Sequence, residues 1–294
     1  MCDDEIHQSQ QLDQNLTHDP RLSRRGFGLA AAALAGYATT AEAQAAAVVV
    51  ETDVSVKTPD GVADAVLFTP PGKGPYPGVL IWTDIGGLRP VFRDMGRRLA
   101  AAGYVVLVPN PFYRSQKAPV IEGPLNFGDP AVRQRLFAMR GAMTNEGIDK
   151  DATAYVGFLD AQAKVNRKAK IGVQGYCMGG PLTLRTGAAS ARIGAGATFH
   201  GGTLVTKTAD SPHLLAPKLH GEYLVCEADN DDKSDPAAKD TVRAAFAAAK
   251  VPLKLEVYEG AMHGWCVPGA AVYNAAAAEK AWSELLALYK RALG

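Results

Sequence analysis

Residues 171–185 read IGVQGYCMGGPLTLR and join a short apolar run to a longer helical one. Residues 171–174 are typical of a buried strand, and residues 179–189 have the length of a helix. Glycines stand two positions before and after Cys177, where the strand must turn sharply and larger side chains would clash. The stretch therefore predicts a strand–turn–helix elbow of the form G-x-nucleophile-x-G, with cysteine as the nucleophile.

The surroundings of Cys177 favour a reactive thiol. At the first turn of a helix, the partial positive charge of the helix N-terminus stabilises a thiolate. The backbone N–H of Met178 is expected to point at the same place and to bind an oxyanion. A buried cysteine without a chemical role is the alternative, but the strand–turn–helix context favours the nucleophile.

A nucleophile of this kind needs a histidine base and an acid that orients it, in the chain order nucleophile, acid, histidine. His263 follows the last expected strand and lies among small residues in the sequence GAMHGW, so it is the expected base. His200 also follows a strand and is a candidate to line the pocket. His213 and His220 flank a proline-containing loop and are expected at the surface or in the core.

The acid is expected just after the strand at residues 222–226, in the run EADNDDK. Its candidates are Asp229, Asp231, Asp232 and Asp235. We favour Asp231 from its position in this loop, with Asp229 as the alternative. The remaining carboxylates are expected to be solvated.

The rest of the chain alternates between strand and helix patterns. Strands are expected at residues 52–58, 62–69, 78–82, 104–108, 171–174, 194–199, 222–226 and 253–257. Helices are expected at residues 91–102, 130–140, 149–163, 179–189, 236–250 and 271–293. This alternation predicts an α/β fold, with a mostly parallel sheet, helices on both faces and a hairpin at one edge.

No Gly/Ser/Pro-rich linker divides residues 50–294, which favours a single domain. The long segment 109–147 is expected to border the ligand crevice at the carboxyl ends of the strands.

Composition excludes several other classes. The chain has 294 residues, is 47% apolar and has a formal net charge of +1. It is too apolar for disorder, and it lacks the excess of basic residues that a nucleic-acid surface needs. Its 4 cysteines form no CxxC pair, which argues against a zinc ribbon. No phosphate-loop or HExxH motif is present, so no cofactor or metal is predicted.

The first 43 residues have the features of an export signal. Two arginines, Arg24 and Arg25, precede an uncharged apolar run at residues 29–38, and Ala41-Glu42-Ala43 offers a cleavage site. The pattern resembles a twin-arginine signal. The apolar run is too short for a bilayer, which needs about 20 residues. We therefore expect a mature domain at residues 44–294, periplasmic or secreted. It would meet the export machinery only transiently and would not stay inserted in a membrane.

On these motifs the chain resembles the dienelactone hydrolase family of α/β-hydrolases. The resemblance rests on five stretches: GYCMGG (175–180), YEGAMHG (258–264), ADNDD (228–232), WTDIGG (82–87) and NPFYR (110–114). It implies an α/β-hydrolase fold and a triad of Cys177, His263 and Asp231. It also implies a second oxyanion donor at the backbone N–H of Ile85, and an arginine, Arg114, that grips a substrate carboxylate.

Two positions depart from the family pattern. Asp84 stands where members often carry a glutamate that contacts the resting cysteine, so we count it among the residues that face the substrate. A second arginine expected shortly after the histidine has no match, and Trp265 is expected to give a more apolar wall instead. The loss of an arginine–carboxylate contact argues against a small dianionic lactone acid as substrate.

The expected activity is hydrolysis of a lactone or small carboxylic ester through a thioester on Cys177. A general carboxylesterase or thioesterase with the same triad is one alternative, and a non-catalytic binding protein on a hydrolase scaffold is another. A redox role for Cys177 lacks a partner cysteine at motif spacing. Metal ligation by Cys177 and His263 lacks further spaced ligands.

Overall fold

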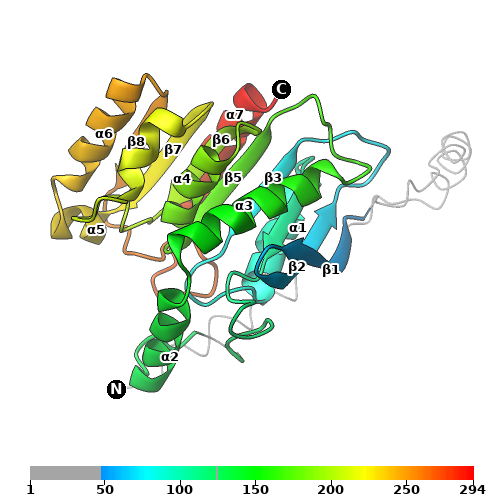
Figure 1. The fold of residues 1–294 in the computed structure, drawn as a ribbon. Helices are drawn as coiled ribbons and strands as arrows, with labels where there is room; N and C mark the ends of the chain where they lie inside the picture. The colour runs from blue at the N-terminus through cyan, green and yellow to red at the C-terminus, as the bar shows by residue number, and fades with distance from the viewer. Residues whose placement is uncertain (1–47, 124) are drawn as a thin grey trace, which may run out of the picture. The chain divides into compact units, whose positions relative to one another are not determined.

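The core of the protein is one eight-stranded sheet, ordered β1-β2-β4-β3-β5-β6-β7-β8 (Figure 1). The computed structural model describes residues 48–294 except 124, so the expected export signal at residues 1–43 lies outside the described residues. The strands are β1 Val50–Thr58, β2 Gly61–Thr69, β3 Gly78–Trp82, β4 Val105–Pro109, β5 Ile171–Tyr176, β6 Ile193–Phe199, β7 Glu222–Ala228 and β8 Leu253–Tyr258. The hairpin β1–β2 joins β4 antiparallel, and all other neighbours are parallel.

Helices cover both faces of the sheet. They are α1 Pro90–Ala101, α2 Pro130–Gly141, α3 Asn145–Asp160, α4 Gly179–Ala189, α5 Asp229–Ser234, α6 Ala238–Ala249 and α7 Ala275–Ala292, with the 3₁₀ helix η1 at Pro212–Lys218. Side chains of α1 and α7 share one core cluster, and those of α3 and α4 pack on the other face (Figure 1). The predicted α/β architecture is therefore confirmed.

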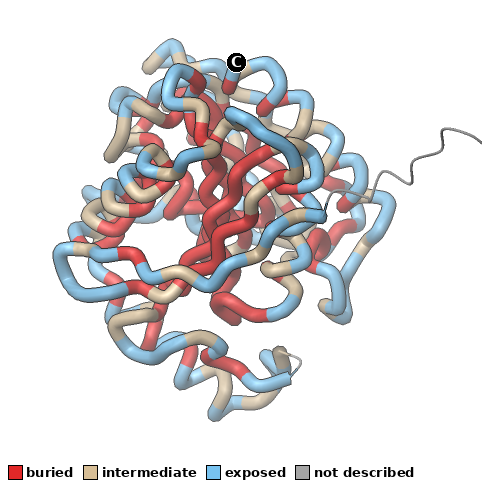
Figure 2. The backbone as a smooth tube through the Cα atoms, turned by 90° about the vertical axis from the view of Figure 1, so that its right-hand side faces the viewer, coloured by how far each residue is buried: buried red, intermediate tan, exposed pale blue. Residues whose placement is uncertain are grey.

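The buried strands supply both cores by the alternation of their side chains. On β3, Val79 and Ile81 belong to the cluster under α1 and α7, whereas Leu80 and Trp82 belong to the cluster under α3. Successive residues of a strand point to opposite faces, so a strand covered on both sides is apolar throughout. Figure 2 shows the result, with buried strands at the centre and exposed positions on the outer elements.

Some helix boundaries differ from the predicted ones because of capping side chains. Helix α3 begins before residue 149, since the Thr144 side chain accepts a hydrogen bond from the Gly147 N–H. Helix α7 begins at Ala275 rather than 271, since Asn274 caps it in the same way. The segment after β7, expected to be a loop, forms the short helix α5. Within residues 48–294, no helix is both long and apolar enough to span a membrane.

The turn after β5 depends on the close approach of two glycines. A Cβ added at Gly175 would lie 1.9 Å from the carbonyl oxygen of Gly179. We predict that Gly175→Ala lowers the free energy of unfolding by about 3 kcal/mol or more, since the clash is with backbone and cannot relax cheaply. Chemical denaturation measures the change.

Gly157→Ala is the matched control. Gly157 lies exposed inside α3, and nothing stands within 4 Å of its added Cβ. This substitution should raise stability by about 0.5–1 kcal/mol, because alanine is the better helix former. Equal effects of the two substitutions would refute the role assigned to the glycine contact.

Candidate active site

Cys177 lies at the junction of β5 and α4 with its backbone in the left-handed region, at φ 52°. Such a conformation is costly for a residue with a side chain and persists only where the surroundings hold it. Two hydrogen bonds hold it here: the Cys177 N–H donates to the Phe199 carbonyl at 3.0 Å, and the Gly180 N–H donates to the Cys177 carbonyl at 3.0 Å. The half-buried thiol consequently points out of the sheet into a pocket.

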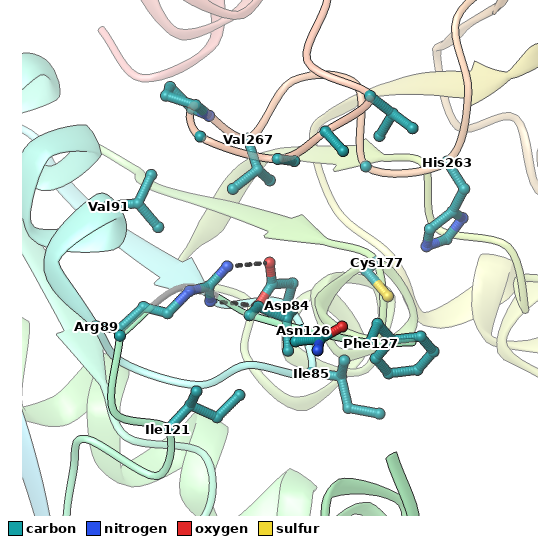
Figure 3. Close-up of a pocket in the computed structure, with 18 of the residues that line it drawn as sticks. Asp84, Ile85, Arg89, Val91, Ile121, Asn126, Phe127, Cys177, His263 and Val267 are labelled. Atoms are coloured by element: carbon teal, nitrogen blue, oxygen red, sulfur yellow. Dashed lines mark hydrogen bonds and ion pairs between the residues drawn. The ribbon is translucent and has the colours of Figure 1, made fainter. Parts of the chain in front are cut away.

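His263 faces this thiol from the loop after β8 (Figure 3). Its Nδ1 is 2.7 Å from the Oδ2 atom of Asp231, and its backbone N–H donates to Asn230 Oδ1 at 2.7 Å. The Asp229 N–H donates to the Ala261 carbonyl at 2.9 Å. These bonds tie the start of α5 to the histidine loop and fix the ring on both sides. Sequence reasoning missed Asn230, which lies beside the expected acid inside the ADNDD stretch but was given no role there.

The structure separates the two candidate acids. Asp231 contacts His263, whereas Asp229 turns away and pairs with the exposed Lys233 at 2.6 Å. Asp232 likewise pairs with Lys239 at 2.5 Å. Because α5 is helical, neighbouring carboxylates point in different directions, and only Asp231 is directed at the ring.

The charges around His263 change its protonation. Burial lowers the pKa of His263, but its interactions with Asp231 and Cys177 raise it, with a net value of about 10. The imidazole therefore holds its proton at neutral pH.

A second histidine lies against the first. His200 is fully buried at the end of β6, and its ring centre is 4.9 Å from that of His263 in an edge-to-face arrangement. Burial and the neighbouring His263 lower the pKa of His200 well below its usual value. The ring is therefore neutral, lines the pocket as expected and limits how far the His263 ring can rotate.

The two expected oxyanion donors lie at the ends of neighbouring parallel strands. Ile85 follows β3 and lines the pocket, and Met178 precedes α4. Within the part of the chain that the structure describes, neither backbone N–H donates to a protein acceptor. The Ile85 turn is held by Asp84, whose Oδ1 accepts from the Gly86 N–H at 2.8 Å. Both donors are thus free to bind a ligand oxygen.

Asp84 lines the pocket, but its carboxylate is occupied by Arg89 (Figure 3). The guanidinium nitrogens lie 2.5 Å from Oδ1 and 2.8 Å from Oδ2, and both side chains are about one-tenth exposed. No hydrogen bond joins Asp84 to Cys177 among the described residues. Arg89, five positions on in the sequence, was missed because an arginine at a helix start has no distinctive pattern.

Two residues expected at the pocket lie outside its lining. Arg114 does not line it, because the guanidinium pairs with Asp60 at 2.7 Å and with the buried Asp151 at 2.7 Å. Burial lowers the pKa of Arg114, but these carboxylates raise it well above its usual value. Trp265 is fully buried and stacks on Tyr258 beneath the histidine loop, so it forms no pocket wall.

The pocket above Cys177 has a volume of about 1140 Å³. Its walls come from the start of α1, the segment 119–128, α2 and the loop 264–272 (Figure 3). Across residues 48–294 without 124, no group of three or more His, Cys, Asp or Glu side chains is arranged to hold a metal ion.

Comparison with known proteins places the chain in a family. A model described as "Dienelactone hydrolase family" matches residues 63–293. The chain belongs to the dienelactone hydrolase family. The resemblance seen in the sequence is thereby confirmed. Membership shows that the protein is a hydrolase that acts on ester or lactone bonds.

Relatives and solved structures agree with this assignment. A Methylorubrum extorquens protein named "Putative carboxymethylenebutenolidase" is 26% identical over 283 residues, covering 92% of this chain and 94% of that protein. A dienelactone hydrolase-like promiscuous phosphotriesterase from metagenomic libraries superposes with a TM-score of 0.67 at 25% identity, covering 83% and 99% of the two chains. A dienelactone hydrolase from Anabaena variabilis shares the fold with a TM-score of 0.58 at 16% identity, covering 84% and 99%.

The raised pKa of His263 predicts a pH-dependent contribution to stability. The folded value is about 10 against 6.5 in the unfolded chain, so the contribution is complete below pH 6.5 and is lost as pH rises toward 10. Asp231→Asn should therefore destabilise the protein more at pH 6 than at pH 9, as measured by urea denaturation.

The control is Asp229→Asn, which breaks an exposed pair with Lys233. Both members of that pair stay charged between pH 6 and pH 9, because the pKa of Asp229 is lowered and that of Lys233 is raised by their mutual hydrogen bond. Its effect should be the same at both values. An Asp231→Asn effect that does not change with pH would contradict the charged His263.

Proposed function

We propose that this hydrolase cleaves a lactone or carboxylic ester through Cys177, His263 and Asp231, by way of a thioester on Cys177. The observation that carries the proposal is the His263 ring, which faces the elbow thiol and is bound at Nδ1 by Asp231 at 2.7 Å. A nucleophile, a base and an orienting carboxylate are the minimum set for this chemistry.

In the first step the thiolate of Cys177 attacks the carbonyl carbon and forms a carbon–sulfur bond. The carbonyl oxygen takes up negative charge and accepts hydrogen bonds from the Ile85 and Met178 N–H groups. One such donor is worth about 3–4 kcal/mol in comparable sites. The tight Asp84 turn and the start of α4 keep these donors in place before substrate arrives, so no reorganisation is needed.

In the second step the tetrahedral intermediate collapses and its carbon–oxygen bond breaks. His263 gives its proton to the departing alkoxide, and a thioester remains on Cys177. His263, now neutral, takes a proton from water as the water attacks the thioester carbon. The carboxylic acid leaves and the thiolate is restored. In a lactone the released hydroxyl stays covalently attached to the acyl chain throughout, so the last step releases a single hydroxy acid.

The same triad serves a general carboxylesterase as well as a lactonase. The placement of Arg114 favours the broader esterase, because no free arginine in the described pocket grips a substrate carboxylate. An intact triad geometry argues against a non-catalytic binding protein.

Removal of the nucleophile tests the proposal. We predict that Cys177→Ala abolishes hydrolysis of 4-nitrophenyl acetate while the circular dichroism spectrum is unchanged, because the thiol is only half-buried. Cys226→Ala is the control, since Cys226 lies fully buried in β7 away from the pocket lining. That variant should stay active. Retention of most activity by Cys177→Ala would refute the mechanism.

The same assay distinguishes the acids. Asp231→Asn is expected to lower kcat by up to about 10⁴, the loss seen when a triad histidine takes the wrong tautomer. Asp229→Asn should have little effect. The reverse result would transfer the role to Asp229.

We also propose that residues 1–43 direct export to the periplasm or outside the cell. The support is the Arg24-Arg25 pair before the apolar run. In a Gram-negative host, the exported protein should begin near Gln44, and replacement of both arginines by lysine should leave full-length protein in the cytoplasm. Arg21→Lys is the control and should be exported. Full-length wild-type protein confined to the cytoplasm would refute the proposal.

A further inference from the structure

The pocket is far larger than a small lactone needs. Its volume of about 1140 Å³ lies above the usual range for small-molecule sites, roughly 300–1,000 Å³. Cys177 and His263 occupy one part of it, and the rest extends between the segment 119–128 and the loop 264–272. A pocket of this size is larger than the small ester substrate expected from the sequence would require.

The walls of this extension are apolar. They include Val91 from α1, Ile121 and Leu125 from the segment 119–128, and Val267 from the histidine loop. Val91, Ile121 and Val267 lie around the Asp84–Arg89 pair, to one side of Cys177 (Figure 3). A wall of aliphatic groups gains free energy only when apolar surface of a ligand is buried against it.

Exposed apolar side chains continue the pocket to its rim. Phe127, Phe137 and Val272 line it and are 39%, 54% and 39% exposed. The two phenyl rings stand edge to face, with centres 5.8 Å apart. Large apolar side chains gathered in solvent at one rim are typical of a binding groove.

Apart from Cys177 and the histidines, the pocket lining carries more negative than positive charge. The charged side chains of its lining, besides the histidines, are Asp84, Arg89 and the exposed Glu122. The guanidinium group of Arg89 donates hydrogen bonds to both carboxylate oxygens of Asp84. Away from His263, a substrate carboxylate would meet a cation that is already paired and two carboxylates of its own sign, so it would find no free partner there.

We infer that the pocket takes esters or lactones bearing a long or aromatic apolar group without charge, and discriminates against those that carry a free carboxylate on that group. The inference rests on the proposed hydrolase function and concerns the substrate of the same site. A small substrate with a free carboxylate would fit this pocket poorly, because the volume is large and the charges of the lining do not favour an anion.

A matched panel of esters tests the inference. With 4-nitrophenyl esters, kcat/KM should rise about tenfold or more from acetate to octanoate, since each added methylene is buried. The 4-nitrophenyl monoester of octanedioate differs from the octanoate ester only by a terminal carboxylate. Its kcat/KM should be about tenfold lower than that of the octanoate ester. A second arm compares methyl butyrate with octyl butyrate by pH-stat titration, in case the alcohol side occupies the pocket. A rise in either arm supports the inference.

A pair of variants ties the preference to this surface. Phe137→Glu should reduce the ratio of octanoate to acetate kcat/KM at least fivefold, because it places a charge on the apolar rim. Leu214→Glu is the control, since Leu214 is 52% exposed on η1 and lines no part of the pocket. It should leave the ratio unchanged, with thermal melts showing that both variants fold.

The outcomes separate this inference from the proposed function. Cys177-dependent turnover without a length preference in either arm, or with the octanedioate monoester favoured, would overturn the inference and leave the hydrolase mechanism standing. Equal loss of the ratio in Phe137→Glu and Leu214→Glu would also overturn it. Failure of the protein to hydrolyse any ester would remove the proposed function and the inference together.

Discussion

The left-handed backbone of Cys177 is the constraint on which the site depends. It is held because β5 and α4 approach so closely at Gly175 and Gly179 that no side chain fits between them. β5 runs in the middle of the parallel sheet, between β3 and β6. The ends of those two strands carry Ile85 and His200 to either side of the thiol. One tight backbone contact therefore sets both the exposure of the nucleophile and the positions of the groups around it.

Electrostatics divides the pocket into two parts. Around Cys177 lie His263, whose pKa is raised, and two backbone N–H groups, of Ile85 and Met178, that bind no acceptor in the described chain. Farther from Cys177, Asp84 and Arg89 are paired with each other, and the walls of the pocket are mainly apolar. Poorly solvated surroundings strengthen the interactions of the first part. They also raise the free-energy cost of placing an unpaired ion in the second part.

Sequence patterns predicted the sheet, most helix positions, the elbow and the approximate place of the acid and histidine. They did not indicate the partners of Arg114, which follows the family motif but pairs with Asp60 and Asp151 from distant segments. The pocket walls could not be predicted either, because the segment 119–128 and the loop 264–272 lack the apolar periodicity of a helix or a strand. Asn230 was hidden among neighbouring carboxylates. Each miss concerns a side chain whose partner is set by packing rather than by its local sequence.

The sequence by itself determined the α/β class and the strand–turn–helix elbow that carries Cys177. Glycine spacing and side-chain alternation depend only on residues that are close in the sequence, so they can be recognised without the tertiary structure. Only the tertiary structure decided that Asp231 rather than Asp229 meets His263, which lies 32 residues further on, and that Arg89 rather than Arg114 lies at the pocket, already paired with Asp84. These outcomes depend on the directions in which helices and loops point their side chains, which are fixed only when distant segments pack together.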